Sequence, residues 1–161
     1  MDETEITVRP IRVEDAGQVL TLQRAAFVTE ALIYDDPDMG PLTQTLEALE
    51  FELHDNLGYV AEIRGRVVGA ARAVTSDSLL LVGRIAVAPD QQGAGIGPQL
   101  LEAMEKRGVE RGCREAELFT GSLSAENLAL YKKLGYRESE RVAQSDGTAQ
   151  IFLRKRLDPP Q

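Results

Sequence analysis

Three glycines lie within five residues of one another, directly after an apolar run and directly before an apolar helical pattern, in IAVAPDQQGAGIGPQLLEAM (85–104). Glycine costs about 0.5–1 kcal/mol relative to alanine inside a regular element, so this placement needs a physical reason. The first N–H groups of a helix have no partner within it, and the helix dipole adds partial positive charge there. Glycines at that position let a phosphate or pyrophosphate approach the main chain. A simple flexible turn is the other explanation.

Two familiar phosphate-binding motifs do not fit this segment. A nucleoside-triphosphate loop requires Gly-Lys-Ser/Thr, whereas Gly97 is followed by Pro98 and Gln99. A dinucleotide fingerprint, G-x-G-x-x-G, that began at Gly93 would require a third glycine where Pro98 stands. The pattern that remains is Q-x-x-G-x-G, from Gln92 to Gly97.

Composition limits the class of protein. The 161 residues, 43% of them apolar, predict one globular domain over 1–161. No run approaches the ~18 apolar residues of a membrane span, and the acidic start MDETEITVRP is unlike a signal peptide, so we expect a cytoplasmic protein that does not contact membranes. A net charge of −8 argues against binding nucleic acid. The single cysteine, Cys113, has no metal-ligand spacing, so we expect no metal.

Hydrophobic periodicity predicts strands and helices along the whole chain. The predicted helices begin near 13, 42, 96 and 124, and the predicted strands are 5–11, two strands within 58–74 that turn near 64–65, 79–89, 115–120 and a hairpin over 141–155 that turns at 146–147. The nearly continuous apolar run at 79–89 predicts a strand buried on both faces. This order predicts an α/β (or α+β) domain with a mixed sheet covered by helices.

At the Q-x-x-G-x-G motif the sequence resembles the GNAT superfamily of acyl-CoA-dependent N-acetyltransferases, whose pyrophosphate-binding motif has this spacing. The segment TGSLSAENLALYKKLGY (120–136) is similar to the family's helix after its fifth strand, and ITVRPIRVEDAGQVLTL (6–22) to its opening strand and helix. The resemblance covers nearly the whole chain. It implies a mostly antiparallel sheet of about six or seven strands with about four helices, and transfer of an acetyl group from acetyl-CoA to a primary amine by direct attack.

The resemblance also implies where acetyl-CoA binds. Main-chain groups of Ile85, Ala86 and Val87 are expected to hold the pantetheine arm, with the N–H of Ala86 or Val87 polarising the acetyl oxygen. The residues expected around the pyrophosphate are Gln92, Gly93, Ala94, Gly95, Ile96, Gly97 and Pro98.

The helix near 124 supplies the remaining expected contacts. Ser124 suits an N-cap, and either Ser124 or Asn127 is expected to contact CoA. Tyr131 is expected to contact CoA and to act as the catalytic acid, because a phenol of pKa about 10 can protonate a departing thiolate of pKa about 8.5.

The acceptor is expected beside the loop that follows the first helix, where the candidate substrate-binding residues are Phe27, Glu30, Tyr34, Asp35 and, on the strand before the glycines, Arg84. Some relatives have a glutamate on that strand as general base, whereas this chain has VGRIAV. Candidates for the base are Glu30, Asp35, Asp36 and His54, or a chain of water molecules.

Two other functions stay open at this stage. The chain could bind acyl-CoA without transferring a group, or it could acetylate a protein N-terminus or lysine instead of a small-molecule amine. A homodimer is a further expectation.

Overall fold

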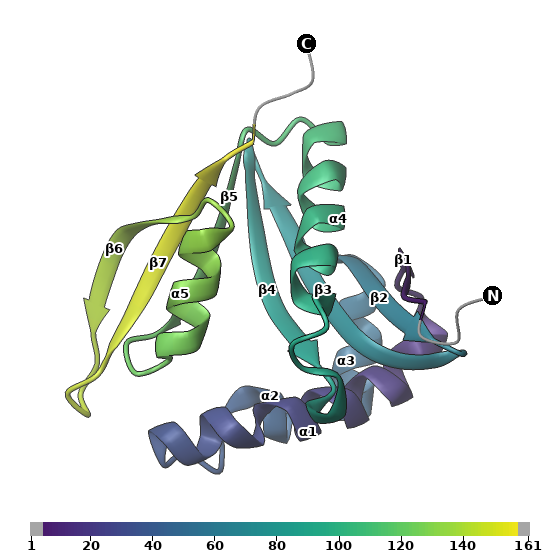
Figure 1. The fold of residues 1–161 in the computed structure, drawn as a ribbon, viewed down its shortest axis with the longest axis horizontal. Coiled ribbons are helices and arrows are strands. Elements are labelled where there is room, and N and C mark those ends of the chain that lie inside the picture. The colour runs from purple at the N-terminus through teal and green to yellow at the C-terminus, as the bar shows by residue number, and fades with distance from the viewer. Residues whose placement is uncertain (1–4, 158–161) are drawn as a thin grey trace.

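The computed structural model describes residues 5–157 and contains one seven-stranded sheet of order β1-β2-β3-β4-β5-β7-β6 (Figure 1). All neighbouring strands are antiparallel except β4 and β5, which are parallel. The strands are β1 (Thr7–Pro10), β2 (Leu57–Ile63), β3 (Arg66–Ser76), β4 (Leu79–Val87), β5 (Glu115–Gly121), β6 (Arg137–Ala143) and β7 (Ala149–Arg156).

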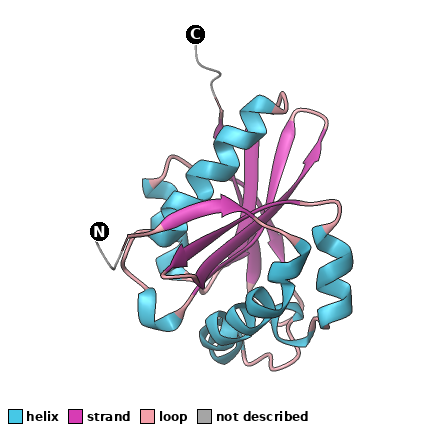
Figure 2. Cartoon of the chain, turned by 90° about the vertical axis from the view of Figure 1, so that its right-hand side faces the viewer, coloured by secondary structure: helices cyan, strands magenta, loops and turns pink. Residues whose placement is uncertain are grey.

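Helices cover both faces of this sheet (Figures 1 and 2). The α-helices are α1 (Ala16–Tyr34), α2 (Gly40–Thr43), α3 (Leu46–Leu53), α4 (Ile96–Glu110) and α5 (Ala125–Lys133), and single 3-10 turns lie at Val13–Asp15 and Pro89–Gln91. Helix α4 packs on β2, β3 and β4, and α1 packs on β3 and β4 from the opposite face. The expected fold class, a mostly antiparallel sheet of six or seven strands flanked by helices, is confirmed.

The strand that is buried on both faces is β3. Residues 67–73 are all buried, because α1 covers one side of β3 and α4 the other. The prediction that 79–89 would be buried on both faces is wrong, since only Leu80, Val82 and Ala86 of β4 are buried. The burial alternates along β4 even where β5 pairs with it: Leu80 faces α4 and is buried, whereas Leu79 and Leu81 on the opposite face are only half-buried, and Leu81 lines a hollow.

Helix α4 approaches the sheet through two glycines. A Cβ at Gly69 of β3 would lie 2.5 Å from Ile96 Cγ2 and 3.0 Å from Leu100 Cδ1 of α4. At the other end of the helix, a Cβ at Gly108 would lie 3.0 Å from Leu80 Cδ2 of β4. These contacts fix the position of the first turn of α4, which is the turn that follows the glycine-rich segment.

The predicted turns are confirmed at both hairpins, where Gly65 and Gly147 have positive φ. The helix predicted from 42 divides into α2 and α3, and the hydroxyl of Thr45 begins α3 by accepting the N–H of Ala48 at 3.1 Å. Asp35, in the left-handed conformation at φ 50°, ends α1.

A buried ion pair fixes the start of α1. Asp15 accepts two hydrogen bonds from the Arg9 guanidinium at 2.8 and 2.9 Å and one from the Arg12 main-chain N–H at 2.7 Å. Arg9 also pairs with Glu62 of β2, at 2.6 Å. The hydrogen bonds from Arg9 hold the pKa of Asp15 below its ordinary value. The pair joins β1, β2 and α1, and so orients the helix that carries Glu30 and Tyr34.

We expect Asp15→Asn to destabilise the protein by about 3 kcal/mol at pH 7, because the substitution leaves a partly buried guanidinium with one carboxylate fewer. The control is Glu14→Gln at the exposed neighbouring position. Because the pKa of Asp15 is lowered by folding, its contribution is present above the ordinary carboxyl pKa near 4 and is lost as the pH falls through the lowered value. Urea unfolding at pH 7 and at lower pH measures this difference, and equal stability of the two variants at pH 7 would contradict it.

Candidate active site

The strands β4 and β5 separate where the site begins. They pair only at their first residues, from Leu79 with Glu115 to Leu81 with Glu117. Just beyond this point β4 contains a bulge, because the register moves three residues along β4, from Val82 to Ile85, while it moves two residues along β3. The extra residue re-aims the side chains and main-chain groups that follow it.

The main chain of β4 faces the separation through alternate residues. The N–H of Ala88 donates to the carbonyl of Val68 in β3 at 2.8 Å, so these two residues form a hydrogen-bonded pair of the ladder. Such pairs alternate along antiparallel strands, which assigns Ala86 to the β3 ladder and turns the main-chain groups of Ile85 and Val87 toward the β5 side. The N–H groups of Ala86 and Val87 are the two expected to polarise the acyl oxygen. The ladder with β3 uses that of Ala86, so the N–H of Val87 is the one that stays available.

The glycine-rich segment needs its glycines for backbone conformation. Gly93 and Gly95 have φ of 85° and 79°, in the left-handed region, and Gly95 is the residue before the first turn of α4. A Cβ at Gly93 would meet no atom within 4 Å, and one at Gly95 would reach only Gln99 Nε2, at 4.0 Å. The space beside this loop is therefore open. The N–H groups of Ile96 and Gly97 lie in the first turn of the helix, and Pro98 has none.

The end of α1 lies near the start of α5 (Figure 1). Residues predicted on the cofactor side and on the acceptor side therefore form one cluster, here called the Glu30 cluster: Glu30, Tyr34, Ser124, Asn127 and Tyr131. Ser124 Oγ donates to Glu30 Oε2 at 2.8 Å, and Asn127 Nδ2 to Glu30 Oε1 at 3.4 Å. Tyr34 Oη lies 2.7 Å from Ser124 Oγ and accepts the N–H of Leu123 at 3.1 Å.

Ser124 does not cap α5 as expected. It stands at the N-cap position and is only 3% exposed, but its hydroxyl makes no capping hydrogen bond and instead binds Glu30 and Tyr34. The prediction of a serine cap is wrong because α1, which is distant in sequence, offers a carboxylate that competes for the hydroxyl.

Tyr131 is placed to hold a proton. It packs against the core and contacts the ring of Tyr136 edge-on, with 6.3 Å between ring centroids. Burial, followed by the negative charge of Glu30, raises the pKa of Tyr131 to about 12. Its phenol is therefore neutral at physiological pH and has a proton to donate.

The other predicted acceptor-side residues lie outside the Glu30 cluster. Phe27 packs against the core, Asp35 and Asp36 are exposed at the end of α1, and His54 is exposed at the end of α3. Arg84 is half-buried in a different group of polar residues, where it donates to Gln44.

The polar group around Arg84 contains residues that the sequence analysis did not single out as functional: Gln23, Gln44, Glu52 and Arg72. One signal was present, because Arg72 interrupts the apolar strand VVGAARAV. Thr120 was likewise not predicted from the sequence; its hydroxyl accepts from Asn127 Nδ2 at 3.4 Å.

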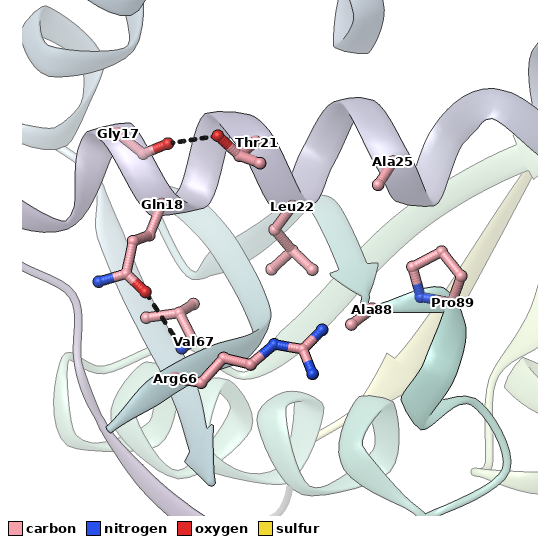
Figure 3. Close-up of a pocket in the computed structure, with 9 residues that line it drawn as sticks. All are labelled: Gly17, Gln18, Thr21, Leu22, Ala25, Arg66, Val67, Ala88 and Pro89. Carbon is pink, nitrogen blue, oxygen red and sulfur yellow. Dashed lines mark hydrogen bonds between the residues drawn. The ribbon is translucent and has the colours of Figure 1, made fainter. Parts of the chain in front are cut away.

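A separate hollow of about 320 Å³ lies between the first half of α1 and the ends of β3 and β4 (Figure 3). Its two long polar side chains already have partners: Gln18 accepts the N–H of Val67 at 3.3 Å, and Arg66 pairs with Asp90 at 2.8 Å. None of its lining residues belongs to the Glu30 cluster, so this hollow is separate from that cluster.

Other kinds of site are not found among residues 5–157. No three His, Cys, Asp or Glu side chains in this part of the chain are grouped as metal ligands. Cys113 is buried, and burial raises the pKa of its thiol, which disfavours the nucleophilic thiolate. None of the helices in the same range is long and apolar enough to cross a membrane.

The mostly antiparallel sheet and the glycine-rich helix start agree with the class that the sequence resemblance implies, the acyl-CoA-dependent acyltransferases. The chain belongs to the acetyltransferase (GNAT) family, whose family model matches residues 20–136. It is 28% identical over 152 residues to an acetyltransferase of Sodalis glossinidius, covering 93% of this chain and 94% of that relative.

Solved structures of the family share the fold. The ribosomal-protein-S18-alanine N-acetyltransferase of Escherichia coli aligns over 98% of this chain and 97% of its own, with a TM-score of 0.73 and 20% identity. The PaiA N-acetyltransferase of Thermoplasma acidophilum, crystallised with coenzyme A, aligns over 95% and 99%, with a TM-score of 0.79 and 17% identity. The protein is thus an acetyl-CoA-dependent acyltransferase.

We expect Gly95→Val to abolish acetyl-CoA binding. Valine would fill the open side of the loop, and it would be strained at positive φ by about 1–2 kcal/mol. Gly112→Val is the matched control, because Gly112 has φ 88°, also faces open space and lies beyond the other end of α4.

Thermal unfolding with and without acetyl-CoA checks this expectation. A ligand at a hundredfold excess over its Kd stabilises the folded state by about 2.7 kcal/mol. Both variants should lose similar intrinsic stability, but only Gly112→Val should keep the ligand-induced shift. An equal shift in both variants would show that the glycines only form a turn.

Proposed function

We propose that this protein is an N-acetyltransferase that transfers the acetyl group of acetyl-CoA directly to a primary amine. The observation that carries the proposal is Tyr131 of α5, a buried phenol that packs against Tyr136 and keeps its proton under the influence of Glu30. A module that only binds acyl-CoA would not need a proton donor at this place.

The residues present fit acetyl-CoA. Gln92 to Gly97 would hold the pyrophosphate, because the space beside Gly93 and Gly95 is open and the first N–H groups of α4 are there to donate. Ile85 and Val87 would bind the pantetheine arm through main-chain groups that the β3 ladder leaves unused. Asn127 would reach the cofactor more readily than Ser124, whose hydroxyl is held between Glu30 and Tyr34.

Acetyl-CoA supplies an activated thioester whose carbonyl carbon a neutral amine can attack. The N–H of Val87 is placed to stabilise the charge that develops on the acyl oxygen, and one such donor is worth about 3 kcal/mol. As the C–N bond forms and the C–S bond breaks, Tyr131 gives its proton to the departing sulfur. The amine must lose one proton to a base before the attack and one afterwards, and this second proton would restore the phenol of Tyr131.

Of the candidate bases, we propose Glu30. Its charge acts on Tyr131, so it belongs to the same cluster as the acid, whereas Asp35, Asp36 and His54 are exposed. Ser124 and Asn127 donate to its two oxygens and thereby orient the carboxylate. The cytoplasmic location and the homodimer that we expect from the sequence stay predictions.

We expect Tyr131→Phe to lower turnover by about 10²–10⁴-fold while changing the Kd of acetyl-CoA far less, because the lost hydroxyl acts mainly in the transition state. The ring keeps its contact with Tyr136, so stability should change little. Tyr59→Phe, which removes a hydroxyl from a partly buried tyrosine of β2, is the control.

The measurement pairs calorimetric binding of acetyl-CoA with release of the free thiol in the presence of amines. Unchanged turnover would make Tyr131 a packing residue, and equal losses in binding and turnover would make it a cofactor contact only. Binding without thiol release from any amine would identify the non-catalytic module instead.

The raised pKa of Tyr131 has its own test. Because its pKa is about 12, the difference in phenolate absorbance between the parent and Tyr131→Phe should be absent at pH 10 and should emerge only near pH 12. Glu30→Gln removes a negative charge that raises this pKa and should move the titration to lower pH. Titration of Tyr131 near pH 10 in the parent would contradict the assigned environment.

A further inference from the structure

A second polar group lies between α1, α3 and the sheet, on the face of β3 and β4 near the bulge. It is called the Arg72 cluster here and consists of Gln23, Gln44, Glu52, Arg72 and Arg84. Arg72 is 4% exposed; its guanidinium pairs with Glu52 of α3 and donates to Gln23 Oε1 at 3.0 Å. The positive charge of Arg72 is therefore balanced by the carboxylate of Glu52.

The positive charge of Arg84 is not balanced by a carboxylate in this way. Arg84 Nη1 donates to Gln44 Oε1 at 2.9 Å, but the same oxygen also accepts from Gln23 Nε2 at 3.0 Å and Arg72 Nη2 at 3.4 Å. An amide oxygen has two lone pairs, so three donors compete for it. A guanidinium has five N–H donors, and Arg84 thus has donors to offer to another acceptor.

The cluster also has an excess of positive charge. It contains two guanidinium groups and one carboxylate, and no Asp or Glu of residues 5–157 forms an ion pair with Arg84. Burial, followed by repulsion from Arg72, lowers the pKa of Arg84, and Glu52 only partly opposes this. The guanidinium stays charged at neutral pH, since arginine titrates far above it.

A hollow of about 230 Å³ opens at this point and is lined by residues that include Glu52, Asn56, Arg72, Gly83 and Arg84. Gly83 and Arg84 both line it because the bulge lies between Val82 and Ile85. The next residue, Ile85, turns its main chain toward the separation of β4 and β5. Along β4 the residues that line the hollow are thus followed directly by Ile85 and Val87, which we expect to hold the acyl group.

On the basis of the proposed function, we propose that Arg84 binds a carboxylate of the acceptor, so that the substrate of this enzyme is an amino carboxylate. The planar fork of a guanidinium matches the two oxygens of a carboxylate. A carboxylate carries one negative charge, which balances the single excess positive charge of the cluster, whereas a phosphate dianion would leave a negative charge in a partly buried place.

Matched acceptors test the proposal. The panel consists of L-amino acids, the corresponding L-amino acid amides and the corresponding decarboxylated amines, each assayed for thiol release from acetyl-CoA. A hydrogen-bonded charged contact is worth about 1.5–3 kcal/mol, so kcat/KM should be about 10- to 100-fold higher for the best acid than for its amide.

Substitutions test whether Arg84 itself, and not a neighbouring residue, causes the preference for a carboxylate. Arg84→Gln should remove the preference for the carboxylate while leaving the Kd of acetyl-CoA and the rate with the amide nearly unchanged, and Arg84→Lys should restore part of the preference. Arg24→Gln is the control, because the exposed Arg24 donates to the main chain of the same Gln44 without lining the hollow.

The outcomes are distinguishable. Equal kcat/KM for acids and amides, or an equal loss for both in Arg84→Gln, would overturn the carboxylate site while leaving the acetyltransferase intact. Acetylation of decarboxylated amines alone, or binding of acetyl-CoA with no turnover of any amino acid, would also overturn it. A failure of acetyl-CoA to bind would instead remove the proposed function itself.

Discussion

The early separation of β4 from β5 is the constraint on which the rest of the structure depends. Pairing that stops at Leu81 leaves the second half of β4 without a partner on one side, and the bulge falls just beyond that point. Helix α4 is held against β3 through the contact of Ile96 with Gly69. This contact places the glycine-rich loop at the end of the part of β4 that pairs with β3 but not with β5. The main-chain donors of β4 and those at the start of α4 are thereby brought close to each other, next to the separation of β4 and β5.

Charge is distributed differently in the molecule as a whole and at the acceptor side. The net charge of −8 weakly favours cationic partners when it is considered alone. Around Arg72 and Arg84 the local balance has the opposite sign. A small acceptor responds to the few groups that it touches in a partly buried hollow, where screening is weak, more than to distant surface charges.

Local signals in the sequence predicted the fold and the turn conformation of the glycine-rich loop well. The glycines at 93 and 95 and the turns at 65 and 147 all follow from backbone conformation, which is a property of neighbouring residues. The Arg72 cluster could not be predicted in this way, because Arg72 meets Gln23 and Gln44 across 49 and 28 residues of chain. The same reason explains Ser124, whose hydroxyl binds Glu30 from 94 residues away and not its own helix. The burial of β4 was overestimated because an apolar run does not reveal how completely helices cover each face of the strand.

The bonds of Glu30 have a mechanical consequence. Because β4 and β5 pair at only three residues each, side chains that cross between the two parts of the sheet add to the shared core that joins them. On one face Glu30 and Tyr34 of α1 hold Ser124. On the other face Glu105 of α4 accepts Tyr136 Oη at 2.7 Å and Lys155 Nζ at 3.0 Å. A carboxylate lies at the centre of each tie, so Glu30 and Glu105 brace the same junction from opposite faces of the sheet, in addition to the hydrophobic core that both parts share.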